Sequence, residues 1–343
     1  MDAVLTAMVE EKIGPGDRSR LLIQTAKEQL SFDYALALRS PAVALHLALK
    51  ALNVQSGQIV VLSALSPRYY LQVIQDLQLT PLYCDVTYDF PCMSRELIEK
   101  TIESKKMENI ETEPDAQVCA IVLHHTLGFI PDTQAIAELG IPIIEDISQS
   151  YGSWFKPENS IAPVFHSKFI ILGLEERDML TSGGGALLFA MNRKDGSLLR
   201  NFAGIAGEYC MPDINSALAV VQFKEAQRNT ERRRDIAEIY IQACLSLASR
   251  TKHKRFISIN DNQYCNYSFS LILETGLKDV IAYAKKKEIE IENAFENTIA
   301  GTQGCSSCPV SSSLVLRTIL FPLYPRLRSL DVERISRLIM TLP

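Results

Sequence analysis

The regular alternation of strand and helix patterns over the first two thirds of the chain is the feature that most limits its fold. Short β-branched and aliphatic runs, typical of buried strands, recur at residues 58–64, 80–86, 117–125, 141–147, 167–174 and 183–190. Helical patterns lie before and between the first four runs, at residues 41–52, 69–79, 94–106 and 132–139. Because βα alternation with short connections favours parallel strands covered by helices, we predict an α/β fold with a mainly parallel sheet.

A long helical pattern at residues 211–250 divides this region from the rest of the chain. Its apolar residues recur at three and four positions, and no glycine or proline follows Pro212. A strand pattern at 267–273 and helical patterns at 276–289 and 327–342 come after it. We therefore predict a large α/β domain over residues 1–225, followed by the interdomain helix and a small α+β domain over residues 226–343.

Charge and apolar content exclude several classes of protein. The net charge of −5 implies no broad basic face, so we expect no nucleic-acid partner. We find no apolar run of membrane-spanning length and no signal-peptide pattern at the N-terminus. The eight cysteines are scattered through apparent core segments, as in reduced cytoplasmic proteins. One CxxC pair, Cys305 and Cys308, is weak evidence for zinc by itself, so we predict no metal site.

The stretch "IPIIEDISQSYGS" carries the strongest chemical signal. A buried strand pattern ends there in Glu145 and Asp146, and Gln149 follows. Open α/β sheets bind ligands at the carboxyl ends of their strands. An acid in that place can pair with a ring nitrogen, bind a metal, act as a base or cap the next helix, and the residues alone leave these roles open. His124 and His125 end the preceding strand pattern, where one side chain is expected to face the same crevice.

Several segments, taken in order, resemble the DegT-type sugar aminotransferase family of fold-type I pyridoxal phosphate (PLP) enzymes. They are "AVALHLALKALNVQSGQIVVLSALSPRYYLQVIQDLQLTPLYCDV", "HTLGFIPD", "IPIIEDISQSYGS", "GGGALLFA", "GEYCMPDINSALAVVQFKEAQRNTERRRDIAEIYIQACL" and "LRTILFPLYPRLRSLDVERISRLI". The resemblance implies a seven-stranded-type sheet with a small C-terminal domain, and a homodimer with PLP at the subunit interface. It also implies keto sugars on nucleotide carriers as substrates, glutamate as amino donor, and a place in amino-sugar or cell-envelope polysaccharide biosynthesis.

The resemblance assigns five candidate site residues. Asp146 matches the acid that pairs with the pyridine nitrogen and keeps it protonated. Gln149 matches the residue near the phenolic oxygen, and His125 matches the histidine of the preceding strand end. Ser40 lies beside the phosphate-binding segment, and Tyr69 lies near the position of the aromatic that stacks on the ring.

The position of the catalytic lysine departs from the family pattern. Counting back from "GGGA" places Arg177 there, and counting forward along "FIILGL" places Asp178 there. An arginine stays protonated and an aspartate has no amine, so neither forms the internal imine. Lys168 lies about ten residues too early, and no lysine lies between Lys168 and Lys194.

The phosphate-binding positions also depart from the pattern. Pro41 has no N–H and Ala42 has no hydroxyl, so this segment offers fewer donors to a phosphate. Glu208 stands where an Asn-Tyr-Arg segment of the partner subunit is expected, and a carboxylate there would repel a phosphate.

Two hypotheses follow from these matches and departures. The first is an enzyme of this family that holds PLP or its amine form non-covalently and does not perform lysine-dependent transamination. The second is a catalytically inactive pseudoenzyme, a dimeric scaffold, regulatory or ligand-binding protein. The retained acid Asp146 favours the first hypothesis, whereas the absent lysine and Glu208 favour the second.

Overall fold

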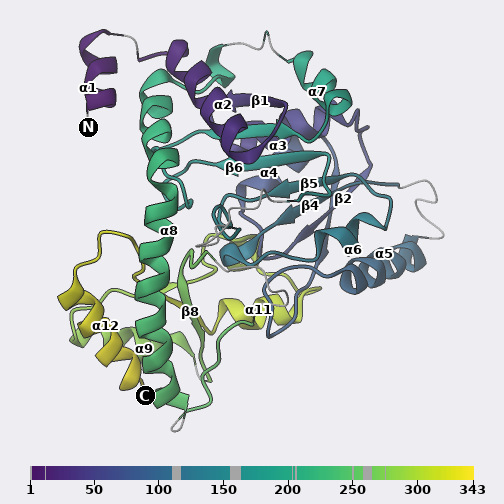
Figure 1. Ribbon diagram of the computed structural model, residues 1–343. Coiled ribbons are helices and arrows are strands. Elements are labelled where there is room, and N and C mark those ends of the chain that lie inside the picture. The colour runs from purple at the N-terminus through teal and green to yellow at the C-terminus, as the bar shows by residue number, and fades with distance from the viewer. Residues whose placement is uncertain are drawn as a thin grey trace.

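The chain folds into a large domain and a small domain joined by one long helix (Figure 1). The computed structural model describes residues 2–11, 13–109, 117–154, 164–202, 204, 207–248, 251–257, 265–274 and 276–343. The helix α8 (Asp213–Ala248) runs along one side of both domains (Figure 1). The expected end of this helix at residues 249–250 lies outside the described residues.

A seven-stranded sheet forms the centre of the large domain, in the order β1-β7-β6-β5-β4-β2-β3. The strands β2 to β6 pair in parallel, whereas β7 is antiparallel to both β1 and β6. This confirms the predicted mainly parallel α/β sheet. The strands are β1 (Tyr34–Leu38), β2 (Ile59–Ser63), β3 (Thr80–Cys84), β4 (Val118–His124), β5 (Ile143–Asp146), β6 (Phe169–Gly173) and β7 (Ala186–Ala190).

Helices cover both faces of this sheet. Most of its strands are apolar on both sides, and both sides therefore need to be shielded from water. One face packs on α3 (Pro41–Ala51), α4 (Tyr69–Asp76) and α7 (Arg193–Arg200), and the other on α2 (Asp17–Leu30), α5 (Arg95–Asn109), α6 (Thr133–Ala137) and α8. The helix α1 (Asp2–Val9) precedes α2 and contacts α8. Two 3₁₀ turns, η1 (Thr126–Gly128) and η2 (Gly207–Tyr209), complete the domain.

The small domain packs helices on a three-stranded antiparallel sheet in the order β8-β10-β9. Its elements are β8 (Phe269–Ile272), α9 (Leu277–Lys286), β9 (Glu292–Asn293), α10 (Ile299–Gln303), α11 (Pro309–Val315), β10 (Thr318–Phe321) and α12 (Ser329–Met340). The strand and helices predicted at 267–273, 276–289 and 327–342 therefore correspond to β8, α9 and α12.

The helix α8 takes part in the cores of both domains. Phe223 and Ala226 pack in the core of the large domain, and Ile236 and Tyr240 pack in the core of the small domain. The packing of α8 thus changes domain between Ala226 and Ile236. The proposed boundary at residues 225/226 lies at the start of this stretch and stays a prediction.

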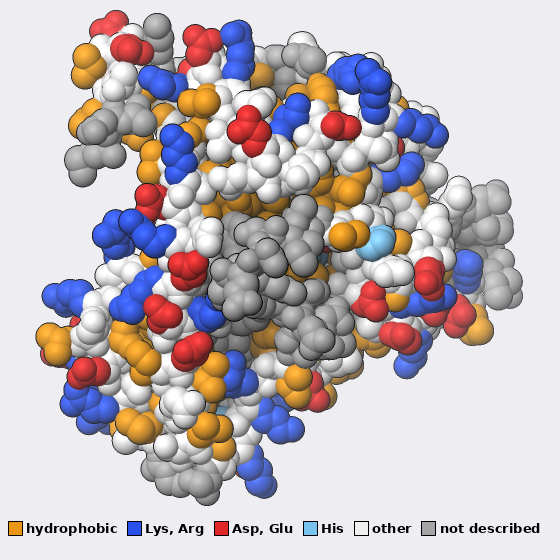
Figure 2. All heavy atoms as spheres, in the orientation of Figure 1, with side chains coloured by type: hydrophobic (Ala, Val, Ile, Leu, Met, Phe, Trp, Pro, Cys, Tyr) orange, Lys and Arg blue, Asp and Glu red, His pale blue; other side chains and the backbone are white. Residues whose placement is uncertain are grey.

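The surface carries mixed charges. On the face shown in Figure 2, basic and acidic side chains are interspersed over α8 and α12. Among the helices of the described residues, none combines the length and the apolar character needed to cross a bilayer.

Candidate functional site

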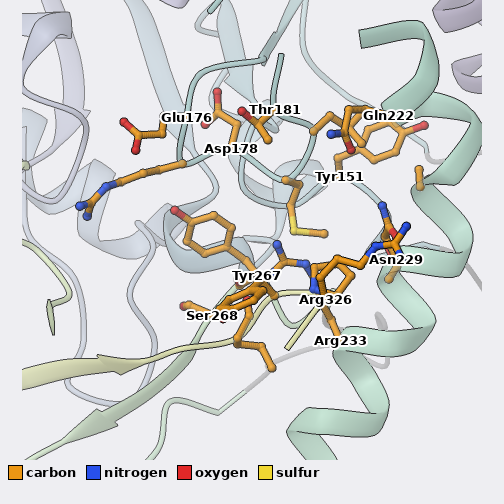
Figure 3. Close-up of a pocket in the computed structure, with 18 of the residues that line it drawn as sticks. Tyr151, Glu176, Asp178, Thr181, Gln222, Asn229, Arg233, Tyr267, Ser268 and Arg326 are labelled. Atoms are coloured by element: carbon orange, nitrogen blue, oxygen red, sulfur yellow. Dashed lines mark hydrogen bonds between the residues drawn. The ribbon is translucent and has the colours of Figure 1, made fainter. Parts of the chain in front are cut away.

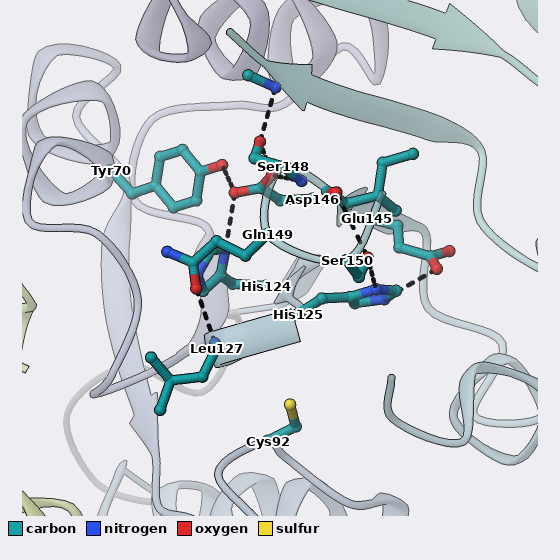
Figure 4. A network of polar contacts seen from close by, with 12 residues as sticks. Tyr70, Cys92, His124, His125, Leu127, Glu145, Asp146, Ser148, Gln149 and Ser150 are labelled. Atoms are coloured by element: carbon teal, nitrogen blue, oxygen red, sulfur yellow. Dashed lines mark hydrogen bonds and ion pairs between the residues drawn. The ribbon is translucent and has the colours of Figure 1, made fainter. Parts of the chain in front are cut away.

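Asp146 lies at the carboxyl end of β5 and is fully buried (Figure 4). Its Oδ1 accepts hydrogen bonds from the backbone N–H of Ser148 at 3.0 Å and from the Ser148 hydroxyl. Its Oδ2 contacts His124 Nδ1 at 2.8 Å and accepts a hydrogen bond from the Tyr70 hydroxyl. The carboxylate is therefore held from β4, α4 and its own strand end.

This environment keeps Asp146 ionised. Burial by itself raises the pKa of a carboxyl group, but the attraction of His124 and the hydrogen bonds from His124, Ser148 and Tyr70 outweigh that effect. The pKa of Asp146 falls from 3.8 to about 2. A carboxylate with this pKa stays charged at every physiological pH.

The structure separates the two histidines at the end of β4. Side chains alternate between the faces of a strand. His124 therefore points to the α3 and α4 face with Asp146, whereas His125 points to the opposite face with Glu145 (Figure 4). The candidate His125 thus lies away from Asp146, and the histidine in contact with that acid is His124. The sequence shows that one of two adjacent histidines faces the acid, but strand register decides which one.

His125 forms a buried cluster of its own. Its Nδ1 lies 2.7 Å from Ser150 Oγ, and its Nε2 lies 3.0 Å from Glu145 Oε1, at ion-pair distance but outside hydrogen-bond geometry. A serine, histidine and carboxylate in a row is the order of a nucleophilic triad. However, all three residues are at most 2% exposed, so no substrate reaches the hydroxyl in this arrangement.

Gln149 stabilises the turn that follows β4. Its Oε1 accepts a hydrogen bond of 2.7 Å from the backbone N–H of Leu127. Leu127 has a φ of 54° and Gly128 a φ of 85°, so the turn is left-handed at both residues. The side-chain oxygen of this candidate cofactor residue is thereby used within the protein.

The two residues that compete for the lysine position point in different directions. Arg177 Nη1 forms a 2.8 Å ion pair with Glu292 Oε2 of the small domain, and both side chains are more than half exposed. Asp178 instead points inward, where its Oδ2 accepts a 2.8 Å hydrogen bond from the backbone N–H of Glu175. Of the two, only Asp178 faces the strand ends.

Asp178 and the Asp146 cluster meet at Gly173, the last residue of β6. A Cβ atom at Gly173 would lie 2.3 Å from Asp178 Oδ2 and 2.7 Å from Ser148 Oγ, so these side chains could not approach the strand end as closely beside a larger residue. The Gly173 N–H also donates a 2.7 Å hydrogen bond to Ser148 Oγ.

The pKa of Asp178 shifts in the opposite direction from that of Asp146. Burial and the negative charges of Asp146 and Glu175 raise the pKa of Asp178 well above its usual value, and the hydrogen bond from the Glu175 N–H opposes them. The cluster thus pairs an ionised carboxylate with a carboxyl group that favours its protonated form.

Lys168 lies at the other end of the sheet. It directly precedes β6, is exposed, and donates its backbone N–H to Ile143 at the start of β5. The five residues of β6 rise about 3.3 Å each, so roughly 16 Å of strand separate Lys168 from the cluster at Gly173.

The remaining candidates lie around the start of α3 and α4. Ser40 caps α3, and its hydroxyl accepts a hydrogen bond of 3.3 Å from the Val43 N–H. Tyr69 is partly buried and packs edge-on against Tyr70 at 4.8 Å between ring centroids.

Glu208 is exposed and lies in the η2 turn. Arg39 of the same chain donates hydrogen bonds to the backbone carbonyls of this turn.

A cavity of about 1040 Å³ lies between α8, the segment 176–181 and the segment 320–326 (Figure 3). Asp178 and Thr181 lie on one side of it, Tyr267 and Arg326 on another, and Gln222 and Asn229 line it from α8. Its volume is in the range of pockets that hold small organic molecules. Sequence reasoning missed this cavity because its lining comes from segments far apart in the chain.

The CxxC pair is buried in the described structure, and none of the eight cysteines forms a disulfide. Burial raises the pKa of the Cys308 thiol, as does the neighbouring Cys305. Within the described ranges, no group of His, Cys, Asp or Glu side chains is arranged to hold a metal ion.

A family model of the DegT/DnrJ/EryC1/StrS aminotransferases matches residues 1–160 and 188–340. The unmatched segment between these ranges contains Lys168, Gly173, Arg177 and Asp178. The unmatched segment therefore includes both residues that counting along the sequence places at the lysine position.

Solved structures of low sequence identity share the whole fold. A DegT/DnrJ/EryC1/StrS aminotransferase from Brucella abortus is 20% identical in sequence. The match covers 98% of this chain and 93% of that protein, with a TM-score of 0.83. A protein from Streptococcus pneumoniae described as a sugar aminotransferase, in its PLP form, has 18% identity, coverage of 99% and 94%, and a TM-score of 0.80. A GDP-4-keto-6-deoxymannose-3-dehydratase variant with bound GDP-perosamine has 13% identity, coverage of 98% and 96%, and a TM-score of 0.80.

Proposed function

The chain belongs to the DegT/DnrJ/EryC1/StrS aminotransferase family, and from that premise we propose that it is a member that binds a nucleotide sugar without lysine-dependent transamination. Its setting is amino-sugar or cell-envelope polysaccharide metabolism in the cytoplasm.

The proposal rests on the contacts of the strand-end cluster, since no lysine is among the described residues that contact Asp146 or approach Gly173. Lys168 is the only lysine between residues 161 and 187, and it lies at the amino end of β6. Asp178 faces the cluster instead, and a carboxyl group cannot form an imine. We therefore expect no transamination that begins from a lysine imine at this position.

The test of this part is a PLP titration followed by borohydride reduction, intact-mass measurement and peptide mapping. We expect only scattered, substoichiometric labelling of exposed lysines and no amino transfer from glutamate to a keto sugar. A stoichiometric adduct on a single lysine, together with amino transfer, would contradict the proposal.

The lining of the cavity supports a nucleotide sugar as ligand. Asn229, Gln222 and Thr181 offer amide and hydroxyl groups that suit sugar hydroxyls, and the exposed Tyr324 offers an aromatic face. Arg326 is exposed, and no contact described in the structure pairs its guanidinium with an acid, which leaves it available to a phosphate. One of the compared structures holds a GDP-linked sugar.

Calorimetric titration with GDP-mannose and with UDP-N-acetylglucosamine tests the ligand class. We expect saturable binding of at least one of them and a loss of about tenfold in affinity for Arg326→Ala, since hydrogen bonds to a charged partner contribute about 1.5–3 kcal/mol. Arg328→Ala is the matched control, because Arg328 is outside the cavity lining and pairs with Asp331. No binding at millimolar concentration, or equal losses for both variants, would argue against the cavity.

The homodimer implied by the family stays part of the proposal. Sedimentation should report twice the chain mass of 38.3 kDa. A monomer at micromolar concentration would remove any site built from two subunits.

A further inference from the structure

The hydrogen-bonding capacity of Asp146 is fully used within the chain. A carboxylate offers about four acceptor positions, two on each oxygen. The Ser148 N–H and hydroxyl take those of Oδ1, and the Tyr70 hydroxyl and His124 take those of Oδ2. A protonated pyridine nitrogen needs one of these positions, so it has to displace a donor that the protein already supplies.

Tyr70 is the donor that closes the cluster toward α4. It is fully buried at the start of α4, and its ring packs edge-on against Tyr69. Burial and the charge of Asp146 raise the pKa of Tyr70 well above its usual value, so the phenol stays protonated and keeps donating. The ring of Tyr70 therefore fills the space beside Asp146, and its hydroxyl occupies an acceptor position of Asp146 Oδ2.

Asp178 and the start of α3 reduce the remaining room. Asp178 lies against Gly173. Its Oδ2, the Ser148 hydroxyl and the Pro41 ring all approach the position that a Cβ atom of residue 173 would take. At the start of α3, the Val43 N–H already bonds to Ser40, and Pro41 has no N–H. The residues present therefore do not fit PLP at this site.

We infer that Tyr70 and Asp178 occupy the cofactor place of this fold, so that Asp146 belongs to a satisfied polar network rather than to a binding site for PLP. This inference rests on the proposed function, because it explains how the chain keeps Asp146 without a lysine partner. In a buried network where every polar group has a partner, removing one hydrogen bond also weakens the neighbouring hydrogen bonds. Asp146 is thus retained for the stability of the strand ends.

Binding of pyridoxamine 5′-phosphate tests the inference. This probe has no aldehyde, so it cannot react with surface lysines. Equilibrium dialysis on the full chain should show no saturable binding to the wild type or to Tyr70→Phe, which keeps the ring. Tyr70→Ser opens the space and frees Asp146 Oδ2, so its affinity should rise by at least tenfold over the wild type. Adding Asp146→Asn should remove that gain.

Tyr240→Ser is the matched control for the loss of a buried tyrosine, because Tyr240 lies in the core of the small domain. It should not gain affinity. Circular dichroism and thermal unfolding establish that each variant folds; if Tyr70→Ser does not, Tyr70→Leu, which keeps more apolar volume, replaces it.

Two results would overturn the inference. The first is saturable micromolar binding by the wild type, and the second is a folded Tyr70→Ser or Tyr70→Leu variant that binds no better than the wild type. Either result leaves the proposal of a lysine-free site standing, since that proposal fails when PLP forms a stoichiometric adduct on one lysine and amino transfer accompanies it.

Discussion

At the scale of single residues, Asp146 and Asp178 are two carboxyl groups of one cluster whose pKa values shift in opposite directions. Asp146 gains donors from three elements, and burial together with the charge of Asp146 raises the pKa of Asp178. The two shifts therefore make opposite contributions to the dependence of stability on pH.

Asp146 should stabilise the fold above pH 4 and cease to do so in acid. Its pKa is lower in the folded state than in the unfolded chain, so its stabilisation is present above 3.8 and is lost as the pH falls toward 2. The shift corresponds to about 2 kcal/mol at pH 7, which Asp146→Asn should remove. Chemical denaturation at pH 7 and at pH 2.5 measures the effect. Asp76→Asn, an exposed change on α4, serves as control, and an equal loss in both variants would refute the assignment.

Asp178 should give the reverse dependence. Because its folded pKa is raised, the folded chain binds more protons than the unfolded one between pH 4 and that pKa, so stability falls as the pH rises through this window. Asp178→Asn mimics the protonated side chain and should remove the fall. Its free energy of unfolding should exceed that of the wild type by more at pH 8 than at pH 5. A difference that is constant with pH would mean that Asp178 does not titrate in this window.

At the scale of elements, the strand ends decide which side chains meet. The sequence patterns predicted the strands β2 to β8 and the acid at the end of β5, because buried strands and strand-end polar residues leave a local signal. They did not identify β1, α2 or β10, and they did not indicate that Tyr70 reaches Asp146. That contact depends on how α4 packs on the sheet, and such packing has no local signal in the sequence.

Asp85 is one of the residues that link elements of the two domains. It follows β3, and its carboxylate accepts hydrogen bonds from the N–H groups of Val310 and Ser311 and from the Ser311 hydroxyl at the start of α11. Asp85→Ala should cost about 2 kcal/mol, since the three hydrogen bonds from α11 and a fourth from the Val86 N–H are lost. Denaturant unfolding measures this cost. Asp132→Ala removes a simple cap from α6 and should cost about 1 kcal/mol; equal costs would argue against Asp85 as a link between the domains.

At the scale of the whole molecule, the fold and the site have separate physical origins. The compared structures keep TM-scores of 0.80–0.83 at 13–20% identity, because apolar packing tolerates many substitutions of similar volume. A family function instead depends on a few side chains at strand ends. Tyr70 and Asp178 can therefore change what the site binds while the sheet and both cores remain.

If the scaffold is otherwise intact, two substitutions should restore covalent capture of PLP. Tyr70→Ser opens the space beside Asp146, and Asp178→Lys places an amine on the side chain that faces the cluster. The double variant should give one borohydride-reducible adduct, mapped by mass spectrometry to position 178. Tyr70→Ser with Arg177→Lys should not give an adduct at position 177 above the surface background, because that side chain points toward Glu292. Equal labelling at the two positions would mean that the segment after β6 is not held as the structure has it, since only a fixed segment lets one of two adjacent amines reach the strand ends.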